Sequence, residues 1–420
     1  MGNATIVNNK KTDTTVDLLK FIFCIFIIAI HTKVIDLLPG KYFIINVFAR
    51  VAVPYFFVAS GYYLRKKYLN SSQNQYKDVL LSYEKRLLYP YVFFLVIALR
   101  QRWTTYMLDG YSPIRVFGHL IQDGLFYPRG ALWFVFALMI AALLTYPFMK
   151  MKNGVNVCLA IGVLLFLFAL ICNNYYFLIV DTPLQTFVDN YMRIFVSARN
   201  GLFFGLVFVS LGMKCYDLHN KSIDNHNKKK ICLFALVLFF ILYVSEITIL
   251  YFLRCERIDD TSLYISQLFF IPVLFLFSVL FPVNIPAKIS VLLRNLSTGM
   301  YYLHRPILWW VLFVTENPAI DFFVVSLTAF AICMISYNVK PELFTPSPGN
   351  RLNTGKTLIK SKNGLQYGHL LPSERVVMSV SHSLPHSLHF HQALRFAKTV
   401  TCVGSRGAFL SDHSAASSGF

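Results

Sequence analysis

Charged side chains are scarce in this chain, and their scarcity excludes a water-soluble globular protein. Asp, Glu, Lys and Arg together make up 14% of the 420 residues, whereas hydrophobic residues make up 56%. Soluble domains carry about a quarter charged residues. The apolar surface of this chain therefore needs a lipid environment rather than a single buried core. The composition predicts an integral membrane protein.

Acidic residues and closely spaced cysteines are also lacking. There are 20 acidic residues against 39 basic ones, which gives a formal net charge of +19. A basic balance often indicates nucleic acid binding, but here Lys and Arg gather in short connections between long apolar runs, as membrane topology requires. We therefore expect no nucleic acid partner. The eight cysteines are scattered singly, without metal or redox spacing, so we expect no metal site and no disulfide framework.

Long apolar runs dominate the first three quarters of the chain. A helix needs about 20 mostly apolar residues to span a bilayer. About ten runs approach that requirement, near residues 17–38, 42–64, 87–100, 131–149, 155–172, 191–213, 231–253, 261–282, 291–314 and 321–337. The predicted fold class is an all-α polytopic transmembrane helix bundle over residues 17–337, preceded by a cytoplasmic segment of residues 1–16.

Basic residues in the connections predict the orientation of this bundle. The connections after the second, fourth and sixth runs are rich in Lys and Arg, and cytoplasmic loops carry such an excess. Both termini are therefore expected in the cytoplasm, in a multi-pass protein of a bacterial inner or plasma membrane. Four residues on the assigned outer side depart from the rule, and they are Arg100, Arg102, Arg115 and Arg129.

The last part of the chain differs from the rest. Residues 338–420 are polar and rich in Ser, His and Pro, with no apolar run long enough to span a membrane. Such a composition predicts a disordered cytoplasmic tail. The sequence leaves open whether this tail is a native extension or a frame-shifted or fused end, and its foreign character favours the latter.

Ionisable residues inside the apolar runs are candidates for function, because burying them in a membrane is costly. With a rise of about 1.5 Å per residue, five of them lie roughly 10 to 14 Å below the outer helix ends. They are His31, Arg50, Arg199, Glu246 and His304. Two structural interpretations remain open: hydrogen bonds from a histidine to a neighbouring helix, and an ion pair between Glu246 and an arginine.

Five segments around these residues carry a resemblance to a known family. They are TVDLLKFIFCIFIIAIHT with Asp17, Lys20 and His31, ARVAVPYFFVASGYYL with Arg50, ALWFVFAL with Trp133, ARNGLFFGLVFVSLGM with Arg199 and Asn200, and NLSTGMYYLHRPIL with His304. Together they resemble the integral membrane acyltransferases called acyltransferase family 3, over about residues 12–337. One departure concerns EKRLLYPYV, which has Arg86 and then Tyr89 where members often carry two basic residues three apart.

The resemblance implies transfer of an acyl group, commonly acetyl, from cytoplasmic acyl-CoA to a hydroxyl of an envelope glycan or lipid-linked sugar. His31 would act as the general base, because histidine titrates near neutrality. Arg50, with Arg199 as second choice, would stabilise the negative charge on the thioester oxygen. Glu246 would orient a histidine or neutralise an arginine, and His304 would bind the acceptor.

The resemblance also implies a donor site at the cytoplasmic side, where basic side chains would hold the CoA phosphates. The candidates are Lys20, Arg65, Lys66, Lys67, Lys85 and Arg86. A purely topological role for these charges remains open.

Two other functions remain open. The segment around Arg50 also resembles the membrane domain of the vancomycin-resistance serine racemases, which indicates binding or transport of a small solute such as serine. Nothing in this chain resembles the fused racemase domain of those proteins. A structural partner in a glycan-assembly complex would need neither His31 nor a CoA site. The acceptor, the acyl chain length and the oligomeric state do not follow from the sequence.

Overall fold

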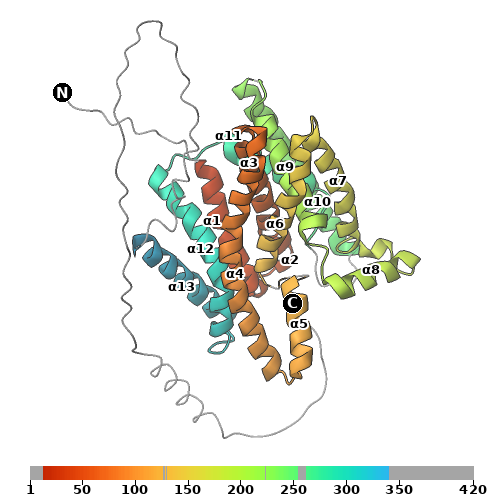
Figure 1. Ribbon diagram of the computed structural model, residues 1–420, viewed down its shortest axis with the longest axis vertical. Helices are drawn as coiled ribbons and strands as arrows, with labels where there is room; N and C mark the ends of the chain where they lie inside the picture. The colour runs from red at the N-terminus through yellow and green to blue at the C-terminus, as the bar shows by residue number, and fades with distance from the viewer. Residues whose placement is uncertain (1–12, 126–127, 129, 223, 254–261, 340–420) are drawn as a thin grey trace, which may run out of the picture. The chain divides into compact units, whose positions relative to one another are not determined.

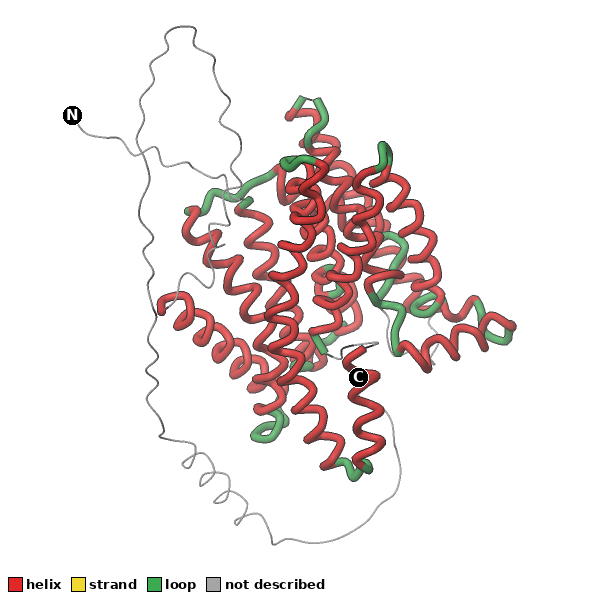
Figure 2. The backbone as a smooth tube through the Cα atoms, viewed as in Figure 1, coloured by secondary structure: helices red, strands yellow, loops and turns green. Residues whose placement is uncertain are grey.

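The computed structural model describes residues 13–125, 128, 130–222, 224–253 and 262–339. Helices joined by short loops make up this part of the chain, and no strand occurs among the described residues (Figure 2). The predicted all-α class is confirmed. The expected tail of residues 338–420 lies outside the described residues except for residues 338 and 339. Residues 1–12 of the expected N-terminal segment also lie outside them.

Each apolar run of the sequence overlaps a helix of the structure (Figure 1). The matching elements are α1 (Thr14–His31), α2 (Lys41–Phe43) continuing through η2 (Ile44–Ala49) towards α3 (Ala52–Leu69), α4 (Tyr76–Leu108), α6 (Leu132–Thr145) with η4 (Tyr146–Lys150), α7 (Gly154–Ile171), η6 (Gly201–Gly205) with α9 (Leu206–His219), α10 (Asn225–Leu253), α11 (Gln267–Leu280), α12 (Ala287–Val311) and α13 (Pro318–Val339). Short helices η1 (Val34–Leu37), η3 (Gln73–Gln75) and η5 (Tyr176–Leu178) lie in connections.

Seven helical stretches are long and apolar enough to cross a membrane by length and composition. They are Thr14–His31, Lys41–Leu69, Leu132–Lys150, Gly154–Ile171, Gly201–His219, Asn225–Leu253 and Pro318–Val339. Helix α11 is apolar but has only 14 residues. The chain is thus a multi-pass membrane protein, while the predicted number of about ten spans and the predicted orientation stay predictions.

Helix α4 is much longer than the apolar run 87–100 predicted. It has 33 residues, beginning at Tyr76 and continuing past Pro90 to Leu108. Its first turns are rich in Leu, Glu, Lys and Arg, which favour helix without being apolar in sum. Hydropathy therefore detected only the middle of the helix. As a consequence Lys85 and Arg86, expected in a loop, lie on α4.

The expected helix 191–213 is interrupted, and this prediction is wrong. Helix α8 (Pro183–Phe195) ends before Val196, which has a φ of 64°, and helical structure resumes only at Gly201. Asn200 begins the next helix, because its side-chain oxygen accepts hydrogen bonds from the backbone N–H groups of Leu202 and Phe203, both at 3.0 Å. Helix α5 (Pro113–Leu125) was likewise not expected. A continuous apolar pattern conceals such a break.

Helices α3 and α9 pack backbone to backbone at two glycines. A side chain on Gly61 would collide with the carbonyl group of Val209, and one on Gly212 would collide with that of Val58. Small residues permit this approach between membrane helices. The contact joins the helix that follows Arg50 to the helix that follows Arg199.

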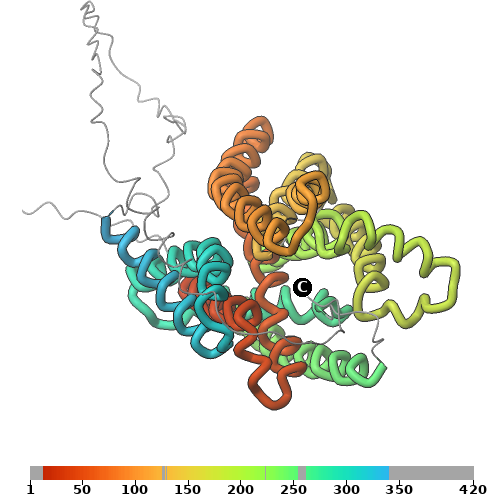
Figure 3. Tube along the Cα trace, turned by 90° about the horizontal axis from the view of Figure 1, so that it is seen from below, coloured from red at the N-terminus to blue at the C-terminus, as the bar shows by residue number. Residues whose placement is uncertain are grey.

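Helices α1, α12 and α13 lie side by side (Figures 1 and 3). Asp17 of α1 is buried and accepts hydrogen bonds from the Arg294 guanidinium of α12 at 2.9 and 2.7 Å and from the Ser290 hydroxyl at 2.6 Å. Sequence analysis did not single out Arg294. This ion pair fixes α1 against α12 near their N-terminal ends, and both helices then run on towards His31 and His304.

Candidate functional site

Two histidines from α1 and α12 meet in the structure. The rings of His31 and His304 stack with their centroids 5.3 Å apart and an interplanar angle of 26°. His31 is the last residue of α1, and Thr32 caps the helix. The Thr32 hydroxyl donates to the Ile28 carbonyl at 3.0 Å. Lys33 then adopts a φ of 59° and turns the chain away. His31 is half-buried, whereas His304 is buried within α12.

Backbone contacts determine the tautomer of His304. Its Nδ1 lies 2.7 Å from the carbonyl oxygen of Tyr301 and 3.3 Å from that of Met300. A carbonyl oxygen can only accept, so Nδ1 carries the hydrogen, and in the neutral imidazole Nε2 then carries a lone pair. This Nε2 is buried and has no hydrogen-bond partner among the described residues. The imidazole is therefore arranged to accept a hydrogen bond or a proton.

Three arginines lie near His31. Arg50, Arg199 and Arg305 all lie close enough to His31 for their charges to act on it, as does His304. The structure thus brings together four of the five residues that depth arithmetic placed in one layer. Arg305 was missed by sequence reasoning, although an arginine directly after an intramembrane histidine in YYLHRPIL is a signal that could have found it. The catalytic roles of these residues stay predictions.

Helix irregularities place two of these arginines. Arg50 follows the π-helix η2, and its backbone N–H donates to the Ile45 carbonyl at 2.8 Å. A π-turn adds a residue to the helix and is frequent at functional sites. Arg199 lies in the break before the π-helix η6, where its backbone N–H donates to the Ser197 hydroxyl oxygen at 3.0 Å. Its guanidinium lies 5.1 Å from the ring centroid of Trp133, within cation–π range.

Glu246 of α10 binds a tyrosine and two backbone amides. Its carboxylate accepts hydrogen bonds from the Tyr175 hydroxyl and, at 2.7 Å each, from the backbone N–H groups of Ile265 and Ser266. The segment before α11 folds over this carboxylate, so backbone amides satisfy it rather than a histidine or an arginine. Glu246 holds α10 to the start of α11, and its expected role of orienting a histidine or neutralising an arginine stays a prediction.

Two of the basic residues proposed for the donor already have partners. The Arg65 guanidinium of α3 forms an ion pair with Asp217 of α9, with Nε to Oδ1 at 3.0 Å. Lys20 of α1 places its ammonium 5.3 Å from the ring centroid of Tyr63. Arg65 therefore contributes to helix packing, whatever else it binds.

The other basic residues of this set are exposed. Lys66 and Lys67 lie at the C-terminal end of α3. Lys85 and Arg86 lie in the first half of α4. Along the chain, the two pairs lie on either side of the connection that contains η3.

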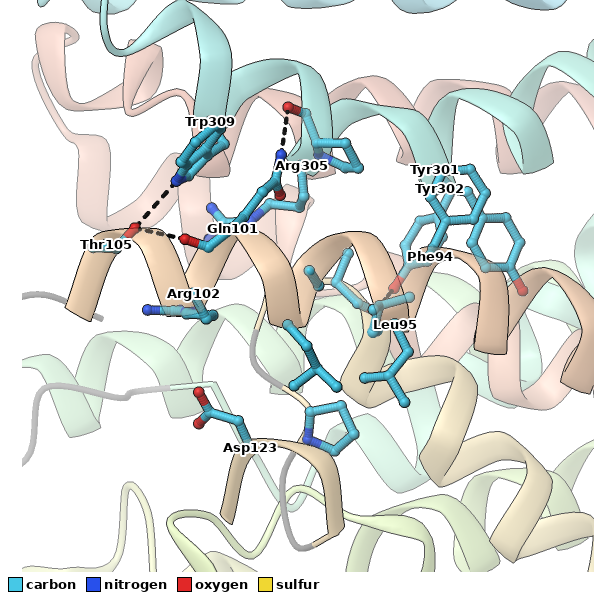
Figure 4. Close-up of a pocket in the computed structure, with 16 residues that line it drawn as sticks. Phe94, Leu95, Gln101, Arg102, Thr105, Asp123, Tyr301, Tyr302, Arg305 and Trp309 are labelled. Atoms are coloured by element: carbon cyan, nitrogen blue, oxygen red, sulfur yellow. Dashed lines mark hydrogen bonds between the residues drawn. The ribbon is translucent and has the colours of Figure 1, made fainter. Parts of the chain in front are cut away.

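A cavity of about 210 Å³ lies beside the histidine pair (Figure 4). Helices α4 and α12 form its walls, and residues at the end of α5 and the start of α6 complete it. Its lining includes Phe94, Arg102, Asp123, Tyr301, Arg305 and Trp309. Tyr301 and Arg305 belong both to this lining and to the surroundings of His304.

Comparison with known proteins decides the family. The profile of acyltransferase family 3, described as an acyltransferase domain, matches residues 13–338. This chain belongs to acyltransferase family 3. The resemblance seen in the sequence motifs is confirmed, and the matched range contains the described helices of this family member up to the last residue but one of α13. No solved structure matches it.

Curated relatives of this acyltransferase family member carry the names of racemases. It is 25% identical to an amino-acid racemase of Enterococcus faecalis over 55% of the chain and 32% of that protein. It is 28% identical to a serine/alanine racemase of Enterococcus gallinarum over 53% of the chain and 31% of that protein. A further amino-acid racemase of Enterococcus faecalis is 24% identical over 80% of the chain. The chain matches between about a third and a half of the length of these relatives.

Proposed function

We propose that this protein is an O-acyltransferase of a bacterial plasma membrane that moves an acyl group, in the first instance acetyl, from acyl-CoA to a hydroxyl of an envelope glycan or lipid-linked sugar. The observation that supports this proposal is the stacked pair of His31 and His304 among three arginines. Acylation of a hydroxyl by a thioester is accelerated by a base that takes the hydroxyl proton and by a hydrogen-bond donor or cation that stabilises the oxyanion, and this arrangement offers both.

The proposed reaction assigns one task to each group. The acceptor oxygen attacks the thioester carbon while His31 takes the hydroxyl proton, and the C–S bond then breaks to release CoA, which regains a proton at sulfur. Arg50, or Arg199 held against Trp133, stabilises the negative carbonyl oxygen that forms during attack. His304, whose Nε2 lone pair is available, accepts a hydrogen bond from a neighbouring hydroxyl of the acceptor.

The donor would approach from the opposite end of the helices. Lys66 and Lys67 lie at the far end of α3 from Arg50, and the rise of a helix puts them roughly 24 Å from it. Their ammonium groups, together with Lys85 and Arg86, suit the phosphates of CoA. The donor would have to bind in an extended form to bring its thioester to the histidine pair.

A test with purified full-length protein in detergent measures labelled acetyl-CoA consumption and acetyl-CoA affinity separately. His31→Ala should lower the transfer rate by about 100-fold to 10,000-fold with nearly unchanged affinity. His304→Ala should mainly raise the KM of the acceptor. His226→Ala is the matched control, because His226 is exposed at the start of α10. Near wild-type transfer by folded His31→Ala would overturn the assignment of the base.

A second candidate function is binding or transport of an amino acid such as serine. Its support is the similarity to proteins named amino-acid and serine/alanine racemases. Uptake of labelled serine into vesicles that contain the protein, without acetyl-CoA consumption, would favour this function. Absence of both activities would favour a structural role in a glycan-assembly complex.

A further inference from the structure

The cavity beside the histidine pair combines aromatic rings at its two ends with charged side chains between them. Trp309 and Tyr302 of α12 and Phe94 of α4 contribute ring surfaces to its lining (Figure 4). The Trp309 indole N–H donates to the Thr105 hydroxyl at 3.2 Å, which connects α12 with α4. Ligand sites commonly combine such apolar walls with a few converging polar groups.

Two guanidinium groups enter this cavity from different helices. Arg102 of α4 and Arg305 of α12 both line it, and their like charges act on each other. Within the part of the chain that the structure describes, neither guanidinium has a hydrogen bond or an ion pair. The third charged side chain of the lining is Asp123, whose carboxylate accepts a hydrogen bond from the Tyr106 hydroxyl at 3.2 Å.

This arrangement is costly without an anion. Arg102 and Arg305 line the same largely apolar cavity and repel each other, and among the described residues neither of them forms an ion pair with the Asp123 carboxylate of this lining. A membrane protein retains such charged groups when they have a partner or a function. A guanidinium binds a carboxylate or a phosphate through two parallel hydrogen bonds. Arg100 provides the contrast, because it lies on the same helix but is exposed and does not line the cavity.

The cavity lies on the acceptor side of the proposed reaction. Arg102 is roughly 24 Å along α4 from Arg86, so it lies near the opposite end of the helix from the exposed basic residues assigned to CoA. The cavity also lies next to His304. Two of its lining residues show this, because Arg305 directly follows His304 and the Tyr301 ring centroid is 5.7 Å from the His304 ring centroid.

We propose that this cavity binds the acceptor, and that the acceptor is an anionic sugar, carrying a carboxylate or a phosphate near the hydroxyl that receives the acyl group. Arg102 and Arg305 bind the anionic group, and the Trp309 ring of the same lining packs on the apolar face of the sugar ring. This inference rests on the proposed acyl transfer.

The test uses full-length protein in detergent and three probes: methyl glucuronide, glucose 6-phosphate and the neutral methyl glucoside. Wild-type protein should bind and acetylate one or both anionic probes in preference to the neutral one. Arg102→Gln should raise the KM for the anionic probe by about 10-fold to 100-fold and leave the neutral probe unaffected. Arg102→Lys keeps the charge but loses the planar donors, so its KM for the anionic probe should lie between the values of the wild type and of Arg102→Gln. Arg100→Gln is the matched control and should behave as wild type.

Several outcomes separate this inference from the proposed function. Equal binding of all three probes, or an unchanged KM in folded Arg102→Gln, would refute the anionic acceptor while acetyl transfer could persist. Competition between methyl glucuronide and CoA without an acyl group would assign the cavity to the donor and also refute the inference. Arg102-dependent binding of an anionic probe without any acetyl-CoA consumption would retain the anion site and overturn the proposed acyl transfer. Preference for glucuronide or for the phosphate identifies the anionic group.

Discussion

The ion pair between Asp17 and Arg294 should respond very differently to removal of either partner. The Asp17 side chain is 2% exposed, whereas the Arg294 side chain is 44% exposed. Removing Arg294 leaves a buried carboxylate with a single hydrogen bond, from Ser290. Leaving one charge of a buried pair uncompensated costs about 3 to 5 kcal/mol.

Removing Asp17 should cost less. The half-exposed guanidinium of Arg294 can turn towards solvent or lipid headgroups, so the loss is that of its charged hydrogen bonds, about 1.5 to 3 kcal/mol. Asp17→Asn retains the shape of the side chain and a contact with Ser290, which places it at the low end of that range. We therefore expect Arg294→Met to destabilise the protein more than Asp17→Asn does.

Unfolding midpoints of purified full-length variants in one detergent measure this asymmetry. The double variant Asp17→Asn/Arg294→Met should recover much of the loss caused by Arg294→Met, because no buried charge is then left unpaired. Lys41→Met is the control: Lys41 and Asp36 lie 3.7 Å apart with 58% and 43% exposure, and such surface pairs contribute about 0 to 1 kcal/mol. A larger loss for Asp17→Asn than for Arg294→Met, or no recovery in the double variant, would refute the reasoning.

Two further predictions concern packing and topology. Gly212→Leu should destabilise the protein by at least about 1 to 3 kcal/mol, measured as a lower unfolding midpoint, because its side chain would meet the Val58 carbonyl; an unchanged midpoint would contradict the close contact of α3 and α9. A cysteine placed at exposed Ser72 should resist an impermeant thiol reagent applied outside the cell, because this position follows the basic residues at the end of α3. A cysteine placed at exposed Thr182 should react with the reagent. The reverse labelling pattern would invert the topology.

Hydropathy predicted the helices that are apolar over their whole length. Helix α7 begins and ends within one residue of the expected run 155–172, because a span requires about 20 apolar residues in sequence. Helix α10 ends with the expected run 231–253 but begins six residues earlier, in the polar residues 225–230. Hydropathy missed the N-terminal turns of α4, which are polar but helical. It also missed the break at Arg199, where one side-chain cap from Asn200 outweighs a pattern that favours a continuous helix.

The candidate site shows a second limit of prediction from the sequence, which concerns the direction of side chains around a helix. Depth along a helix follows from residue number, because the rise per residue is fixed. The direction of a side chain around the helix axis depends on which neighbour the helix packs against, and single-sequence depth arithmetic does not contain it. His304 and Glu246 were assigned the same layer, yet His304 stacks on His31 while Glu246 binds the backbone before α11.

For the histidine pair, the ion pair of Asp17 with Arg294 helps to set the direction in which the side chains of α1 and α12 point. It fixes the rotation of α1 and α12 about their axes, and the fixed helical period then determines where His31 and His304 point further along. Asp17 therefore positions His31 from the other end of the same helix. The stability asymmetry between Asp17 and Arg294 and the proposed chemistry are connected through this register. If variants of the ion pair that remain folded lose acyl transfer while retaining acetyl-CoA affinity, the loss reports misalignment of the two imidazoles rather than loss of the donor site.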